Sequence, residues 1–84
     1  MTWRIDPNAR ATLFSLRDDP TQARLFRKLR SLVVVIVTEP GSRTSRRRAY
    51  QGGGWRVDVP GEDWMILWDV EDGEVVIRYI GPAL

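Results

Sequence analysis

The sequence contains no cysteine and no histidine among its 84 residues. The first absence excludes disulfides and thiol nucleophiles, and the second excludes imidazole acid–base chemistry. Together they remove nearly all zinc sites. Any catalysis would therefore depend on carboxylates, arginines or hydroxyl groups, and we expect neither a metal site nor a cofactor.

Long apolar runs are also missing. The longest, residues 32–37, is far short of the ~20 residues that cross a bilayer, and the N-terminus lacks the charged-then-apolar pattern of a signal peptide. We therefore expect a cytoplasmic protein with no membrane partner. A chain of 84 residues with 43% hydrophobic content can build one compact core, so residues 1–84 should form a single domain.

The charges are distributed unevenly along the chain. The formal net charge is only +2, yet residues 1–56 carry 12 basic and 4 acidic side chains, whereas residues 57–84 carry 1 and 7. Twelve of the 13 basic residues are arginine, which suits bidentate contacts with phosphate or carboxylate. This asymmetry favours RNA, DNA or an acidic peptide as partner. The same pattern would arise if the basic and acidic parts of the chain neutralised each other at the surface of the folded protein.

Two helices are expected after a short first strand at residues 2–5. Asp6-Pro7 and Asp19-Pro20 each place a capping carboxylate before a proline in the first helical turn. The first helix should end near Arg17. The second should continue to about Thr38, because its apolar stripe stays in phase up to a Glu-Pro-Gly stop. The β-branched run at 32–37 would favour a strand on local propensity alone.

Residues 41–54 are rich in serine, arginine and glycine and predict a mobile, linker-like loop. The period then changes to two, which predicts strands at 55–59, 64–70 and 74–80. Asp72-Gly73 between the last two is a type I′ hairpin signal. The expected fold is α+β, in the order strand-helix-helix-strand-strand-strand, with two helices packed on one face of a four-stranded, mainly antiparallel sheet.

A two-residue hairpin loop fixes which side chains share a face of this sheet. Val70 should oppose Val75, Trp68 should oppose Ile77, and Ile66 should oppose Tyr79. We expect these six residues, and most of the tryptophans, on the face of the sheet that the helices cover. The other face, which we call the open face, mixes apolar and charged residues and is typical of a docking surface. Its expected members are Met65, Leu67, Asp69, Val76, Arg78 and Ile80, with Arg56 and Asp58 from the preceding strand.

The order of these elements resembles the RelE/ParE superfamily of bacterial toxins over nearly the whole chain. The segments that carry the resemblance are the second helix at 22–32, the strand Gly54-Trp-Arg-Val-Asp-Val, and residues 64–81. They are similar to the family's aromatic-Arg-x-Arg strand, its Tyr-Arg-x-x-Tyr strand and its valine-rich last strand ending in glycine. The resemblance also supports a helix, not a strand, at 33–37.

The resemblance implies either of two activities. RelE-type members are ribosome-dependent mRNA endonucleases held inactive by an antitoxin peptide, and ParE-type members inhibit DNA gyrase. Arg56 matches the first basic residue of the strand motif and is the candidate catalytic residue. Asp58 stands where a second basic residue is expected and Met65 where an arginine is expected, and Pro82 follows Gly81 in place of a basic pair. The RelE-type ribonuclease site is therefore partial.

Two hypotheses follow for the site and its partners. The first is a RelE-like mRNA interferase or translation inhibitor that contacts the ribosome or mRNA through its arginines, namely Arg43, Arg46, Arg47, Arg48, Arg56 and Arg78. The second is a non-catalytic protein, ParE-like or degenerate, that binds gyrase, an antitoxin or a second copy of itself through Met65, Leu67 and Ile80.

Overall fold

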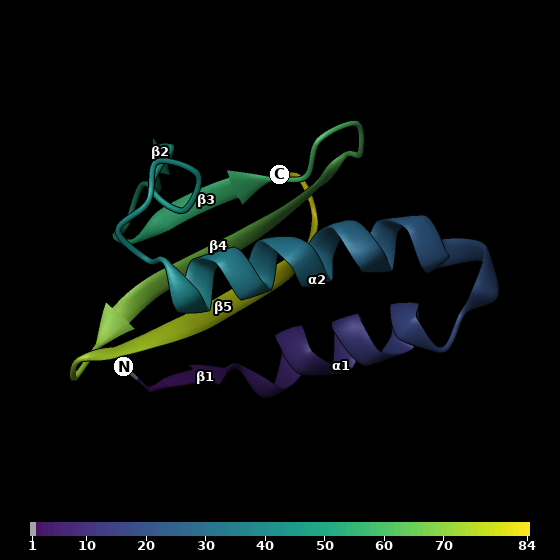
Figure 1. Cartoon of the computed structure of the whole chain (residues 1–84), viewed down its shortest axis with the longest axis horizontal. Coiled ribbons are helices and arrows are strands. Elements are labelled where there is room, and N and C mark those ends of the chain that lie inside the picture. Colours follow the sequence, from purple (N-terminus) through teal and green to yellow (C-terminus); the bar gives the residue numbers. More distant parts are fainter. Residues whose placement is uncertain (1) are drawn as a thin grey trace.

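The computed structural model describes residues 2–84 and shows two helices packed on a five-stranded mixed sheet (Figure 1). The sheet order is β1-β5-β4-β3-β2, with β1 parallel to β5 and the other neighbours antiparallel. The elements are β1 (Trp3–Ile5), α1 (Pro7–Arg17), a 3₁₀ turn (Pro20–Gln22), α2 (Ala23–Thr38), β2 (Arg48–Ala49), β3 (Trp55–Asp58), β4 (Trp64–Glu71) and β5 (Glu74–Pro82). The α+β class is confirmed, but the expected four-stranded sheet is wrong because β2 adds a fifth strand.

α1 begins at the predicted Asp6-Pro7 pair, whereas Asp19-Pro20 begins the 3₁₀ turn that leads into α2 at Ala23. The Asp6 carboxylate accepts a hydrogen bond from the Asn8 amide at 2.9 Å, and the Asp19 carboxylate accepts one from the Thr21 amide at 3.0 Å. α2 runs through the valine-rich segment to Thr38 because packing outweighs local strand propensity there: its buried residues recur at helical spacing. Within residues 2–84, no helix combines the length and apolarity needed to cross a membrane.

The segment at 41–54 is not the linker-like loop that its composition predicts. Ser45 is fully buried, and its hydroxyl donates to the Glu39 carbonyl at 2.9 Å. The Ser45 carbonyl in turn accepts a hydrogen bond from the Trp68 indole N–H at 2.8 Å. β2 then pairs with the start of β3, with Arg48 opposite Arg56. These contacts fix the arginine-rich segment against the sheet.

The β4–β5 hairpin follows the expected register only near its turn. Asp72 and Gly73 have φ values of 53° and 79°, as a type I′ turn requires, and Trp68 pairs with Ile77. A bulge between Leu67 and Trp68 then shifts the register by one residue, so that Leu67 pairs with Tyr79. The prediction that Ile66 opposes Tyr79 is wrong, because Ile66 opposes Ile80. Beyond the bulge, Tyr79 and Ile80 are each on the face opposite to the one expected.

The four tryptophans differ in burial. Trp68 is 1% exposed and stacks on Trp55 with ring centroids 4.7 Å apart, and Trp55 and Trp64 pack against the core while partly buried. Trp3 is 47% exposed and is not part of the core. It lies on the edge strand β1, and α1 starts directly after β1 and leads away from Trp3 (Figure 1).

Candidate functional site

A groove runs along the edge of the sheet between α2 and β3. Its main cavity has a volume of about 470 Å³, and an adjoining cavity of about 330 Å³ shares Leu32 and Pro60 with it. We call the two together the edge groove. The edge groove is lined by Arg27, Lys28, Ser31, Leu32, Thr44, Arg47, Arg48, Arg56, Val57, Asp58 and Pro60. Five of these side chains are basic and one is acidic.

The edge groove exists because β2 is only two residues long. β2 pairs with Trp55 and Arg56, so the rest of β3 has no outer strand neighbour among residues 2–84. At the far end, Pro60 has no N–H to offer an added strand, and the Lys28 ammonium donates to the Pro60 carbonyl at 2.8 Å. The edge is thereby protected against sheet extension while its side chains stay accessible.

Asp58 joins two of the groove's arginines. Its carboxylate accepts hydrogen bonds from Arg48 Nη1 and from Arg56 Nε, both at 2.8 Å. Burial alone would raise the pKa of Asp58, but the hydrogen bonds and charges of Arg56 and Arg48 outweigh it and lower that pKa below its ordinary value of 3.8. The Arg56 side chain is only 15% exposed, and its Nη1 also donates to the Leu84 carbonyl at 3.4 Å. The candidate catalytic residue is thus held by the fold.

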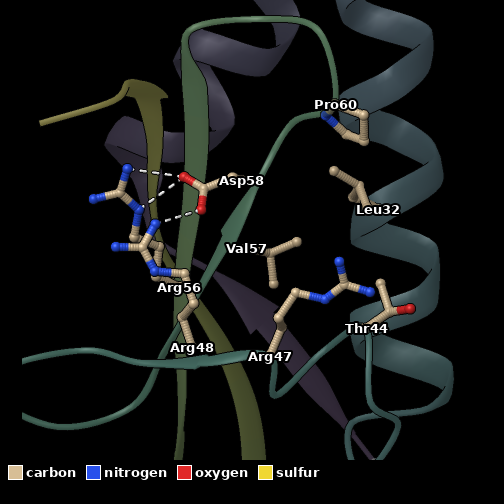
Figure 2. A pocket seen from close by; sticks show the side chains of 8 residues that line it. All are labelled: Leu32, Thr44, Arg47, Arg48, Arg56, Val57, Asp58 and Pro60. Carbon is tan, nitrogen blue, oxygen red and sulfur yellow. Dashed lines mark hydrogen bonds and ion pairs between the residues drawn. The ribbon is translucent and has the colours of Figure 1, made fainter.

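The arginines of residues 41–54 have different roles. The Arg46 guanidinium lies 4.5 Å from the centre of the Trp55 ring, and its Nε donates to the Pro40 carbonyl. Arg43 is exposed and lines neither cavity of the edge groove. Arg47 forms no ion pair within residues 2–84, and Figure 2 shows its side chain reaching toward α2 beside Thr44. Arg48 lies on the other side of β3, next to Arg56 (Figure 2).

The open face is not basic. Arg78 pairs with Asp69 at 3.0 Å and with Glu71, and Arg4 pairs with Glu71 at 3.2 Å and Glu74 at 3.9 Å. The Arg78 hydrogen bond lowers the pKa of Glu71, and the Glu71 and Asp69 carboxylates raise the pKa of Arg78. These contacts neutralise the charges within the face. Of these two surfaces, the edge groove is therefore the more basic.

Three residues expected on the open face, Met65, Val76 and Ile80, are buried and cannot contact a partner. Met65 is on the expected side of β4 but is fully buried. Ile80 is 2% exposed and belongs to the core beneath the helices, because the bulge reverses its direction. Leu67 remains on the open face and is partly exposed.

Tyr79 takes the place that Ile80 was expected to fill on the open face. It pairs with Leu67, which pairs with Arg56 on the other side, so these three residues form a row across β3, β4 and β5. The Tyr79 hydroxyl donates to the Pro82 carbonyl at 3.0 Å, and its ring lies over Gly81. The sequence does not predict Tyr79 on the open face, because an unbroken hairpin would place it beneath the helices and no glycine or proline marks the bulge.

A further cavity, of about 210 Å³, lies on the open face between β4, β5 and residues 50–53. We call it the open-face cavity. It is lined by Tyr50, Gln51, Gly52, Gly53, Leu67, Trp68, Asp69 and Arg78. Across residues 2–84, no three acidic side chains gather closely enough to hold a metal ion.

Replacing Asp58 by asparagine is expected to reduce the free energy of unfolding by about 1 kcal/mol at pH 7, because two charge-assisted hydrogen bonds on a half-exposed group are lost. Since the folded pKa is lowered, the contribution of Asp58 is present above pH 3.8 and is lost as the pH falls through the folded pKa. Urea denaturation should therefore separate native protein and variant at pH 7 but not well below pH 3.8. A difference that persists in acid would contradict this origin.

Comparison with known proteins adds no assignment: no family model matches the chain, and no curated protein matches it.

Proposed function

We propose that the chain is a toxin-like protein of the RelE/ParE kind that binds RNA through the edge groove and inhibits translation. The carrying observation is that five basic side chains line two adjoining cavities at the sheet edge: Arg27 and Lys28 from α2, and Arg47, Arg48 and Arg56 from β2, β3 and the segment before them. Basic side chains arranged along a groove neutralise successive phosphates of a nucleic acid strand. The order of helices and strands, with β1 alongside β5, supports the proposed kinship.

Within this proposal, binding is the main activity and cleavage is not required. RNA cleavage needs a group free to take or give a proton near the 2′-hydroxyl. Arg56 is committed to Asp58 and the Leu84 carbonyl, and the open-face carboxylates Asp69 and Glu71 are paired with Arg78. This arrangement supplies charge for phosphate contacts. It supplies no evident acid–base pair among the described residues.

Inducible expression in a bacterial host tests the proposal. The native chain should arrest growth while a reporter mRNA examined by primer extension stays intact. A double variant with Arg47→Ser and Arg48→Ser should restore growth, because it removes the two most accessible cations of the main cavity. The matched control is Arg10→Ser with Arg43→Ser, which removes the same charge from exposed positions outside the edge groove.

The outcomes separate the alternatives. Normal growth with the native chain would contradict a toxin-like activity. Arrest that survives in the Arg47/Arg48 variant would contradict the edge groove as the working surface. Arrest with cleaved mRNA would establish an mRNA interferase and would require a catalytic role for Arg56.

A second candidate function is binding of an acidic protein segment, such as an antitoxin peptide, a surface of gyrase or a second copy of the chain. The observation that favours it is the apolar floor of the edge groove, which Leu32, Val57 and Pro60 form beneath the basic side chains. A partner held by apolar contacts should stay bound at about 1 M salt, whereas RNA should dissociate. Gel filtration of the complex in low and high salt distinguishes the two.

A further inference from the structure

The main cavity of the edge groove has an apolar floor. Leu32 of α2, Val57 of β3 and Pro60 line it, and Figure 2 shows the Leu32 and Val57 side chains in the space between α2 and β3. Val57 is buried, whereas Leu32 is half-buried and Pro60 is exposed. A flat apolar group that covers this floor would remove apolar surface from water, which is favourable.

An unpaired cation borders this floor. In Figure 2, Leu32 and Val57 lie between Pro60 at one end and the Arg47 guanidinium at the other. Arg47 forms no ion pair within residues 2–84, so its guanidinium is available to an anion.

The one acidic side chain of the main cavity is already occupied. Asp58 accepts hydrogen bonds from Arg48 and Arg56, and Figure 2 shows these three side chains on the other side of β3 from Arg47. An anion at Arg47 is therefore not opposed by a free carboxylate of the cavity lining. The adjoining cavity continues the groove past the floor and adds two more cations, Arg27 and Lys28.

We propose that the main cavity binds one unstacked nucleotide, with its base on the floor of Leu32, Val57 and Pro60 and its phosphate on Arg47. The inference rests on the proposed RNA binding and names what the edge groove takes: a nucleotide whose base is free to leave the stack. The volume of about 470 Å³ falls in the range of about 300–1,000 Å³ typical of small-ligand pockets. A duplex keeps its bases paired and stacked, whereas a single strand can splay them out.

An acidic peptide shares the negative charge of RNA but fits this edge less well. Peptides that bind at a sheet edge gain affinity from the main-chain hydrogen bonds of an added strand. Pro60 has no N–H to offer there, and Lys28 already donates to the Pro60 carbonyl. A nucleotide needs no such ladder, because its base binds through its face and its phosphate through charge.

The floor should select purines over pyrimidines only weakly. The side chains of Leu32, Val57 and Pro60 form no hydrogen bonds, so they cannot read the edge of a base. A purine gains only from its larger contact area.

The test is a titration of ¹⁵N-labelled protein with AMP, UMP, adenosine and ribose 5-phosphate, following the amide signals of Thr44 and Val57. AMP should bind at least about fivefold more tightly than ribose 5-phosphate, which lacks the base, and than adenosine, which lacks the phosphate. Arg47→Ser should weaken AMP binding at least about fivefold. Arg43→Ser, which removes an exposed cation that lines neither cavity, should leave it unchanged.

A free nucleotide and a nucleotide within an RNA strand present the same chemistry, and competition separates them. AMP should displace a labelled single-stranded oligoadenylate from the native chain. It should not displace the duplex that this strand forms with oligouridylate, because paired bases cannot enter the main cavity.

Three results would overturn the proposal: equal affinity for AMP and ribose 5-phosphate, AMP binding that Arg47→Ser leaves unchanged, or displacement of AMP by a short polyglutamate peptide as readily as by oligoadenylate. If RNA binds in a salt-dependent manner while AMP and ribose 5-phosphate bind equally, the nucleotide pocket is wrong and the proposed function stands. If AMP binds selectively but RNA does not bind, the main cavity is a site for a free nucleotide and the proposed function is wrong.

Discussion

The double variant Arg47→Ser/Arg48→Ser is expected to bind single-stranded RNA roughly 20-fold more weakly than the native chain at about 0.1 M salt. Each phosphate contact to a single strand releases about 0.7 of a counterion, so the loss of two contacts makes the slope of log K against log salt shallower by about 1.4. If native protein and variant bind equally at about 1 M salt, their affinities then differ by about 1.4 log units at about 0.1 M. Arg47 forms no ion pair within residues 2–84, and Arg48, although paired with Asp58, is 55% exposed, so both can reach a phosphate. Fluorescence anisotropy of a labelled RNA over a salt series measures both quantities.

Two further variants test whether this loss of affinity comes from the edge groove. The charge-matched control Arg10→Ser/Arg43→Ser should change the affinity by less than about threefold, because screened charges outside the edge groove act only at long range. Asp58→Asn should strengthen binding severalfold, since it removes the one acidic side chain of the edge groove and releases Arg48 and Arg56. Equal losses in both double variants would mean that net charge, not the edge groove, governs binding.

Gly54→Ala should lower the free energy of unfolding by about 4 kcal/mol. Gly54 has a φ of +81°, which costs a residue with a side chain about 1–3 kcal/mol, and the added Cβ would lie 2.4 Å from the Trp68 carbonyl oxygen. Relieving that overlap requires a backbone shift, at a further cost of about 1–3 kcal/mol. For a domain of this size the melting temperature should fall by about 15 °C or more. Thermal unfolding followed by circular dichroism measures the loss.

Gly52→Ala is the matched control for this effect. Gly52 also has a positive φ, +103°, but an added Cβ would meet nothing within 4 Å. Its cost should therefore be limited to backbone strain, about 1–2 kcal/mol. If the two variants melted together, the close approach of Gly54 to β4 would not hold in solution, and the wall of the open-face cavity would be displaced.

Local signals predicted those parts of the fold that depend on neighbouring residues. Asp6 marks the start of α1, and Asp19 marks the start of the 3₁₀ turn before α2, because a capping carboxylate acts within three residues. The stripe of Leu25, Leu29, Val33 and Ile36 predicts α2 to its end because its phase never changes. Asp72-Gly73 predicts the turn because both residues must adopt positive φ.

The errors have long-range causes. The bulge in the β4–β5 hairpin depends on how two whole strands fit the helices, and it moves Ile80 into the core and Tyr79 to the open face. The order of residues 41–49 depends on Ser45, whose partner Trp68 lies 23 positions away in the chain. A short polar segment with many arginines gives no indication of that contact.

The candidate site was predictable only in part, for the same reason. Arg47, Arg48 and Arg56 were selected by their clustering and by the strand motif, and the structure brings all three to the edge groove. In the sequence, Arg27 and Lys28 fall outside the apolar stripe of the second helix, which indicates only that they lie on its polar side. Lys28 lies one turn before Leu32 and points toward Pro60, a placement that only the packing of α2 against β3 determines. Arg46, which was also predicted to contact a partner, lies over the Trp55 ring.

The most direct test of the central claim is the affinity of the native chain for a short single-stranded RNA as a function of salt. With three to five basic side chains of the edge groove contacting phosphates, log K should fall with log salt at a slope of about −2 to −3.5. Undetectable binding at low salt, or an affinity that salt does not change, would contradict RNA recognition through the edge groove.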